Sequence, residues 1–86
     1  MKFRLHNQAK KFMRSLNTKE KDRLTKAITN LPNGNVKPYQ AQSGVFRLRV
    51  GDWRILWQYG TEINDSGETE TIILISKIDN RGDVYK

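Results

Sequence analysis

The chain has 86 residues, with 16 Lys or Arg against 9 Asp or Glu, so its formal net charge is +7. The absence of cysteine excludes disulfides and thiolate metal sites, and the longest purely apolar run, residues 72–75, is far too short to span a membrane. We therefore expect one domain over residues 1–86, located in the cytoplasm, with nucleic acid or an acidic protein as its partner. A basic surface that serves only solubility is the alternative.

The first half of the chain predicts a short strand followed by two helices. Residues 2–6 alternate apolar and basic side chains, which is typical of a strand with one buried face. Apolar residues then recur at helical spacing over 9–16 and 24–31. Between these segments Asn17 and Glu20 have the spacing of a capping box. The short link predicts an antiparallel helical hairpin, and we expect residues 33–44 to cross irregularly to the next element.

Residues 46–57 predict a tight β-hairpin. Gly51-Asp52 joins two alternating runs and suits a two-residue primed turn. The register of such a turn places Arg49 opposite Arg54. The face that must pack against the helices then gathers Phe46, Leu48, Val50, Trp53, Ile55 and Trp57. The opposite face gathers Arg47, Arg49, Arg54, Leu56 and Gln58.

The remaining segments complete an α+β pattern. Residues 60–68 predict a long exposed turn, and residues 69–77 predict a strand that is apolar on both faces. The expected fold is an antiparallel two-helix hairpin packed on one face of a small, mostly antiparallel four-stranded sheet, in the chain order β-α-α-β-β-β. The arginine side of this sheet is expected to stay open.

The hairpin arginines are the residues best suited to chemistry. Like charges directly opposite each other destabilise a sheet, and the two hairpin strands carry no acid to offset Arg47, Arg49 and Arg54. This suggests an anion supplied from outside, and we expect Arg54→Ala to fold normally. Arginine binds phosphate oxygens bidentately and can stabilise the charge that develops during phosphodiester cleavage. Together with Arg81 and Tyr85, the set suits phosphodiester binding and cleavage equally. One histidine without cysteine leaves no metal site, and no cofactor motif is visible.

The hairpin and the last residues resemble the RelE/ParE superfamily of bacterial and archaeal toxins from toxin–antitoxin systems. Residues 46–57 (FRLRVGDWRILW) are similar to the family's aromatic–R/K–hydrophobic–R/K–V–G–D/x–Y/W–R hairpin. Residues 80–85 (NRGDVY) resemble its H/N-R-x-x-[VI]-Y ending, and residues 9–16 resemble the start of its helical hairpin. The resemblance covers nearly the whole chain.

In the RelE branch, this resemblance implies a toxin that a cognate antitoxin holds inactive. It implies a ribosome-dependent, metal-independent endoribonuclease that cuts mRNA in the decoding site by attack of a ribose 2′-hydroxyl on the adjacent phosphate. The predicted catalytic residues are Arg49, Arg54, Arg81 and Tyr85. The predicted RNA-binding residues are Arg47, Arg49, Arg54 and Lys77.

Two residues depart from the family pattern. Asn80 stands where many relatives place a histidine, which shifts acid–base chemistry to Tyr85 or an arginine, and Asp79 stands where some RelE-type toxins carry a cation. Two other functions stay open. One is a ParE-like poison of DNA gyrase, since fold does not fix function; the other is a non-catalytic module whose basic face docks an acidic peptide. The combination of Arg49, Arg54 and Tyr85 favours the nuclease.

Overall fold

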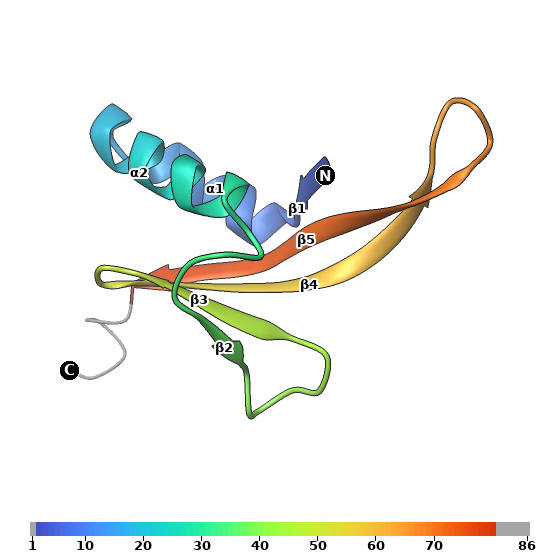
Figure 1. Ribbon diagram of the computed structural model, residues 1–86. Coiled ribbons are helices and arrows are strands. Elements are labelled where there is room, and N and C mark those ends of the chain that lie inside the picture. The colour runs from blue at the N-terminus through green and yellow to red at the C-terminus, as the bar shows by residue number, and fades with distance from the viewer. Residues whose placement is uncertain (1, 81–86) are drawn as a thin grey trace.

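Two helices pack on one five-stranded sheet in the computed structural model, which describes residues 2–80. The elements in chain order are β1 (Lys2–Leu5), α1 (Asn7–Ser15), α2 (Thr18–Thr29), β2 (Val36–Pro38), β3 (Phe46–Val50), β4 (Trp53–Ile63) and β5 (Thr69–Asn80). The strands lie in the order β1-β5-β4-β3-β2, with β1 parallel to β5 and every other neighbour antiparallel. Both helices cover the same face of the sheet (Figure 1). The predicted α+β class is confirmed.

The sheet has five strands, so the prediction of four is wrong. The missed strand is β2, which lies within the segment expected to be irregular and pairs with β3 at the edge of the sheet. Three residues are too few for an alternating pattern to stand out among the Pro, Gly and Asn around them. Pro38 is tolerated because an edge strand needs hydrogen bonds on one side alone.

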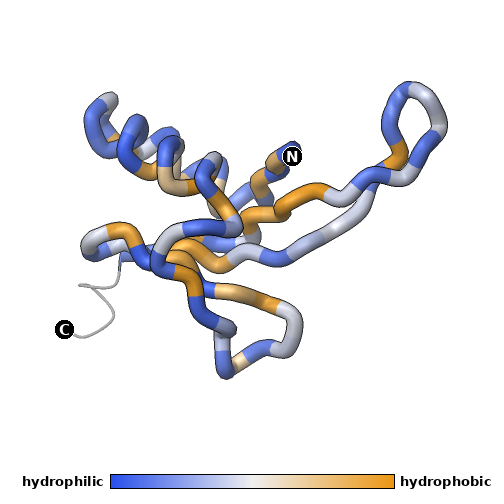
Figure 2. The backbone as a smooth tube through the Cα atoms, in the orientation of Figure 1, coloured by the Kyte–Doolittle hydropathy of each residue, from blue (hydrophilic) through white to orange (hydrophobic). Residues whose placement is uncertain are grey.

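A second correction concerns the long turn expected over residues 60–68. The pairing of β4 with β5 continues to Ile63 and Thr69, so only residues 64–68 connect the two strands. The two strands project beyond the rest of the sheet as an arm with a hydrophilic tip (Figures 1 and 2). Ile63, near this tip, keeps 73% of its surface exposed.

The central hairpin has the predicted register. Phe46 pairs with Trp57, Leu48 with Ile55 and Val50 with Trp53. Gly51 has a φ of +58°, and among residues 2–80 no non-glycine residue has a positive φ, so Asp52 keeps a negative φ; this is the pattern of a type II′ turn. The turn therefore fixes which side chains of both strands face the helices.

The core lies between the helices and the inner face of the sheet. Leu24 and Ile28 of α2 and Leu31, which follows it, are buried, as the helical spacing of this segment predicted. In Figure 2 the hydrophobic positions gather where the helices meet the central strands. The indole of Trp57 is 1% exposed and stacks on Phe46, with ring centroids 4.8 Å apart. Within residues 2–80, neither helix is long and apolar enough to cross a membrane.

A side chain of α1 completes the outer edge of β5. Hydrogen bonding from β1 to β5 ends with the amide of His6 on the carbonyl of Ile75, at 2.9 Å. Beyond that point the Gln8 amide donates from Nε2 to the Ile78 carbonyl at 2.7 Å, and its Oε1 accepts from the Ile78 amide at 2.9 Å. Gln8 thus takes the place that a further residue of β1 would occupy. It protects this edge of β5 from pairing with another chain.

We predict that Gln8→Ala lowers the free energy of unfolding by about 1–3 kcal/mol, because two backbone groups of Ile78 lose their partners. Gln40→Ala is the control, since this glutamine is exposed in a loop, and its effect should stay within about 0.5 kcal/mol. Urea unfolding curves of both variants measure the difference. Equal stabilities would mean that water replaces Gln8 without cost.

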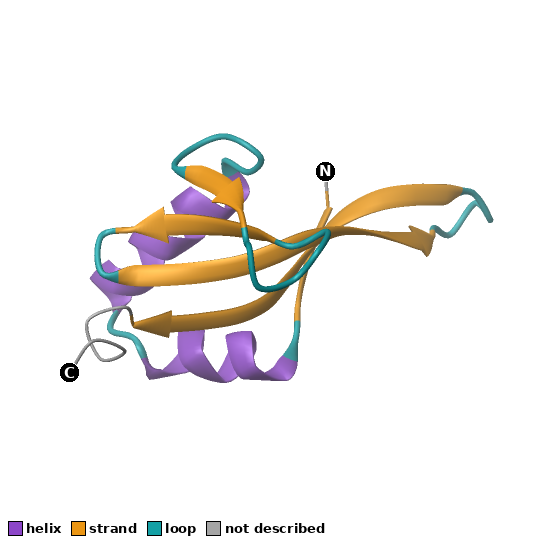
Figure 3. Ribbon diagram, turned by 90° about the horizontal axis from the view of Figure 1, so that it is seen from below, coloured by secondary structure: helices purple, strands orange, loops and turns teal. Residues whose placement is uncertain are grey.

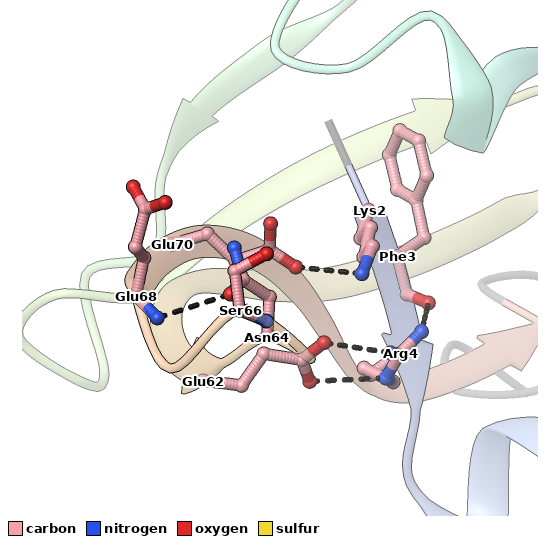
Figure 4. A network of polar contacts seen from close by, with 8 residues as sticks. All are labelled: Lys2, Phe3, Arg4, Glu62, Asn64, Ser66, Glu68 and Glu70. Carbon is pink, nitrogen blue, oxygen red and sulfur yellow. Dashed lines mark hydrogen bonds and ion pairs between the residues drawn. The ribbon is translucent and has the colours of Figure 1, made fainter.

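Two ion pairs brace β1 against the arm (Figure 4). Lys2 Nζ lies 2.8 Å from Glu70 Oε1, and Arg4 Nη2 lies 2.6 Å from Glu62 Oε1. Glu62 and Glu70 are directly opposite each other on β4 and β5, so each cation offsets repulsion between two carboxylates. The hydrogen bond from Lys2 lowers the pKa of Glu70, and the nearby positive charges add to this effect.

A lowered pKa predicts a pH-dependent contribution of Glu70 to stability. The ionised form is favoured in the folded chain, so the contribution is present above the ordinary glutamate pKa and is lost as the pH falls through the lower folded-state value. Glu70→Gln should therefore lower Tm at about pH 7, and this effect should become smaller as the pH is lowered toward about 3. Glu68→Gln changes an exposed carboxylate of the adjacent turn and should give a difference in Tm that is small at both pH values.

Candidate functional site

Figure 3 views the sheet from the face away from the helices, with the helices behind the strands. The strand register places two rows of mostly charged residues on this face. Residues directly opposite each other on paired strands share a face. The registers of the β2–β3, β3–β4 and β4–β5 pairs therefore define each row. The first row contains Lys37, Arg47, Leu56 and Lys77. The second row contains Arg49, Arg54 and Asp79. We call these two rows the arginine face; it holds five basic side chains and one acid.

A β-bulge at Ser76 decides which residues of β5 join this face. Leu56 pairs with Lys77, whereas the next residue, Trp57, pairs with Ile75, so Ser76 is the extra residue. Its hydroxyl donates to the Leu56 carbonyl at 3.1 Å. The bulge shifts the alternation by one position, which turns Lys77 and the acid two residues later toward the arginines.

Arg54 is held by groups from two neighbouring segments. Its Nε lies 3.2 Å from Oδ1 of Asp79, and its Nη2 lies 3.1 Å from Oδ2. The ring of Tyr39, which follows β2, lies 5.7 Å from the Arg54 Cζ. The side chains of Arg54 and Asp79 are 22% and 20% exposed. These contacts orient the guanidinium on a rigid part of the sheet.

The arginine face is therefore less open than its residues alone predict. Arg47, Arg49 and Arg54 are all half-buried, and Leu56 between them is 8% exposed. The Nε of Arg49 is buried and makes no hydrogen bond to a described residue. Partial burial strengthens the attraction of such cations for an anion because fewer water molecules screen the charge.

The structure brings four of the predicted site residues onto one face. Arg47, Arg49 and Arg54 lie as the hairpin register predicts, and Lys77 joins them through the bulge. The other predicted residues, Arg81 and Tyr85, lie outside the described residues.

Three residues on or beside this face were missed as parts of the site. Lys37 and Tyr39 belong to the segment expected to be irregular. The expectation that the arginines lack an acid considered their own two strands alone, and Asp79 reaches Arg54 from β5. One available signal was the spacing of isoleucines at 73, 75 and 78, which indicates a break in alternation.

Chemically, the arginine face suits a bound anion. Arginine forks match phosphate oxygens, and two cationic rows about 7 Å apart along the strands could contact successive phosphates of an extended strand. Among residues 2–80 no three His, Asp or Glu side chains are placed to hold a metal ion.

The fold is that of an α+β domain with a helical hairpin on one side of a mixed sheet and cations on the other. Among solved structures it is similar to a chain of the RelB–RelE antitoxin–toxin complex from Methanococcus jannaschii, with a TM-score of 0.62. The alignment covers 95% of this chain and 94% of that chain, at 18% sequence identity. This likeness shows a shared fold. No family model matches the chain, and no curated protein matches it in sequence.

The Arg54–Asp79 pair changes the expected stability of an arginine variant. From the sequence, removing Arg54 relieves repulsion with Arg49 and costs nothing. In the structure it also leaves the half-buried Asp79 carboxylate without the two hydrogen bonds from Arg54. We predict that Arg54→Ala lowers the free energy of unfolding by about 1–3 kcal/mol.

A double-mutant cycle in urea unfolding measures this interaction. Adding Asp79→Ala to Arg54→Ala should recover part of the loss. Lys77→Ala, at an exposed position of the same face, serves as the control with an effect within about 0.5 kcal/mol. An unchanged stability for Arg54→Ala would show that relief of arginine repulsion offsets the lost pair.

Proposed function

We propose that this chain is the toxin of a toxin–antitoxin module and acts as a ribosome-dependent endoribonuclease on mRNA. The observation that carries the proposal is the pairing of Arg49 with Arg54 on a face where five cations surround one acid. The fold shared with a chain of an antitoxin–toxin complex and the hairpin and tail motifs support the same family.

In the proposed reaction, a ribose 2′-oxygen attacks the adjacent phosphorus while the bond from phosphorus to the 5′-oxygen breaks. The products are a 2′,3′-cyclic phosphate and a 5′-hydroxyl. The 2′-hydroxyl gives its proton to a base, and the leaving oxygen receives one from an acid. Arg54 would stabilise the extra negative charge on the phosphate oxygens, and Arg49 would hold the same group. Arg47 and Lys77 would bind flanking phosphates.

The acid–base roles fall to residues near the end of the chain. The family motif assigns Tyr85 as a base or stacking group and Arg81 as a cation near the phosphate. A tyrosine base requires a lowered pKa, which nearby arginines favour because they stabilise the phenolate. The cognate partner in this proposal is an antitoxin with an acidic or amphipathic segment, complementary to the net charge of +7.

Primer extension on an mRNA translated with purified ribosomes tests the proposal. We expect cuts at codon positions with the wild-type chain and a loss of at least about 100-fold in cutting rate with Arg54→Ala. Arg14→Ala removes the same charge from the exposed side of α1 and should cut like the wild type.

Two outcomes would favour the other functions. DNA breaks that depend on gyrase, without mRNA cuts, would identify a gyrase poison. Tight binding of an acidic peptide with neither activity would indicate a non-catalytic module. The stability of Arg54→Ala must be measured alongside, because this variant is also expected to fold less stably.

A further inference from the structure

The acid of the arginine face occupies the edge of Arg54 that best binds phosphate. Nε and Nη2 form a planar fork, and both nitrogens donate to the carboxylate of Asp79, at 3.2 and 3.1 Å. A phosphate group accepts from the same fork with similar geometry. One guanidinium edge cannot serve both anions in the same bidentate arrangement.

The surroundings of this pair show that it is part of the folded sheet. Arg54 and Asp79 are direct neighbours in the β4–β5 register, and both side chains are about four-fifths buried. Tyr39 lies against the guanidinium from the β2 side. The bulge at Ser76 turns Asp79 toward this face, so the carboxylate occupies its place without any bound partner.

The charges around the pair favour exchange of one anion for another. Arg49 lies directly opposite Arg54, and its buried Nε makes no hydrogen bond to any residue in 2–80. The Asp79 carboxylate accepts both of its hydrogen bonds from Arg54, the cation next to Arg49 in the register. A phosphodiester, whose two non-bridging oxygens are arranged tetrahedrally around phosphorus, could accept from both guanidinium groups.

We propose that Asp79 is a built-in counter-ion that competes with RNA phosphate for the Nε–Nη2 edge of Arg54. This inference rests on the proposed function, in which the arginine face binds the scissile phosphate. In the free protein the carboxylate reduces the repulsion between Arg54 and Arg49. It also lowers the affinity of the site for external anions. Binding of a phosphate then requires Asp79 to leave the fork.

The affinity for a short single-stranded RNA, measured by fluorescence anisotropy, tests the competition. Asp79→Asn keeps the shape of the side chain but removes its charge, and its NH2 group cannot accept from Nη2. We expect Kd to fall about tenfold, which corresponds to 1.4 kcal/mol. Asp52→Asn is the control, because it removes an exposed acid from the adjacent β3–β4 turn and should change Kd less than about twofold.

A measurement on the unaltered chain removes any dependence on how the variants fold. Inorganic phosphate is titrated while NMR follows the Arg54 Nε–H resonance and the carboxyl carbon of Asp79. Displacement predicts that both resonances move with one midpoint. A shift of Arg54 alone would overturn the proposal, since Asp79 would then have kept its place in the fork.

The outcomes separate this inference from the proposed function. A wild-type chain that binds RNA, together with an Asp79→Asn variant that binds equally or more weakly, overturns the competition and leaves the nuclease proposal standing. Weaker binding by the variant would mean that Asp79 positions Arg54 for the phosphate. Failure of both chains to bind RNA and phosphate overturns the proposed function, and the inference with it.

Discussion

The register of the β3–β4 hairpin is the constraint on which the rest of the structure depends. A two-residue turn with Gly51 at positive φ leaves one way to pair the strands. A slip by one residue would bring arginines into the core and aromatic side chains into water. Because Trp57 and its neighbours must be buried beneath the helices, the arginines are gathered on the other face. Core packing and the charge of the arginine face are therefore two results of one pairing.

The bulge in β5 adds the acid that this face requires. Three arginines on adjacent strands would repel one another, and hydrogen bonds from Arg54 to Asp79 reduce that cost. The same carboxylate makes the face less attractive to external anions. Stability of the free chain and affinity for phosphate consequently oppose each other at a single side chain, as is common where a fold carries a functional site.

The edges of the sheet are completed by side chains and ion pairs more than by further strands. Gln8 makes the two hydrogen bonds to β5 that a strand residue would make. Pro38 has no N–H group, so β2 offers one donor fewer to another strand. At the far end, Lys2 and Arg4 tie the first strand to the arm. The two rows of the arginine face cross β3 and β4, which have neighbouring strands on both sides.

The sequence by itself determined the two helices, the central hairpin with its register, and the gathering of Arg47, Arg49 and Arg54, because these follow from local periodicity and turn chemistry. Only the tertiary structure decided that β2 pairs at the edge, that β1 lies parallel to β5, and that Asp79 meets Arg54. Those features depend on which distant strands come together and on one extra residue in a bulge. The periodicity of a strand's sequence does not show which distant strand it pairs with, because that choice depends on contacts between segments far apart in the chain.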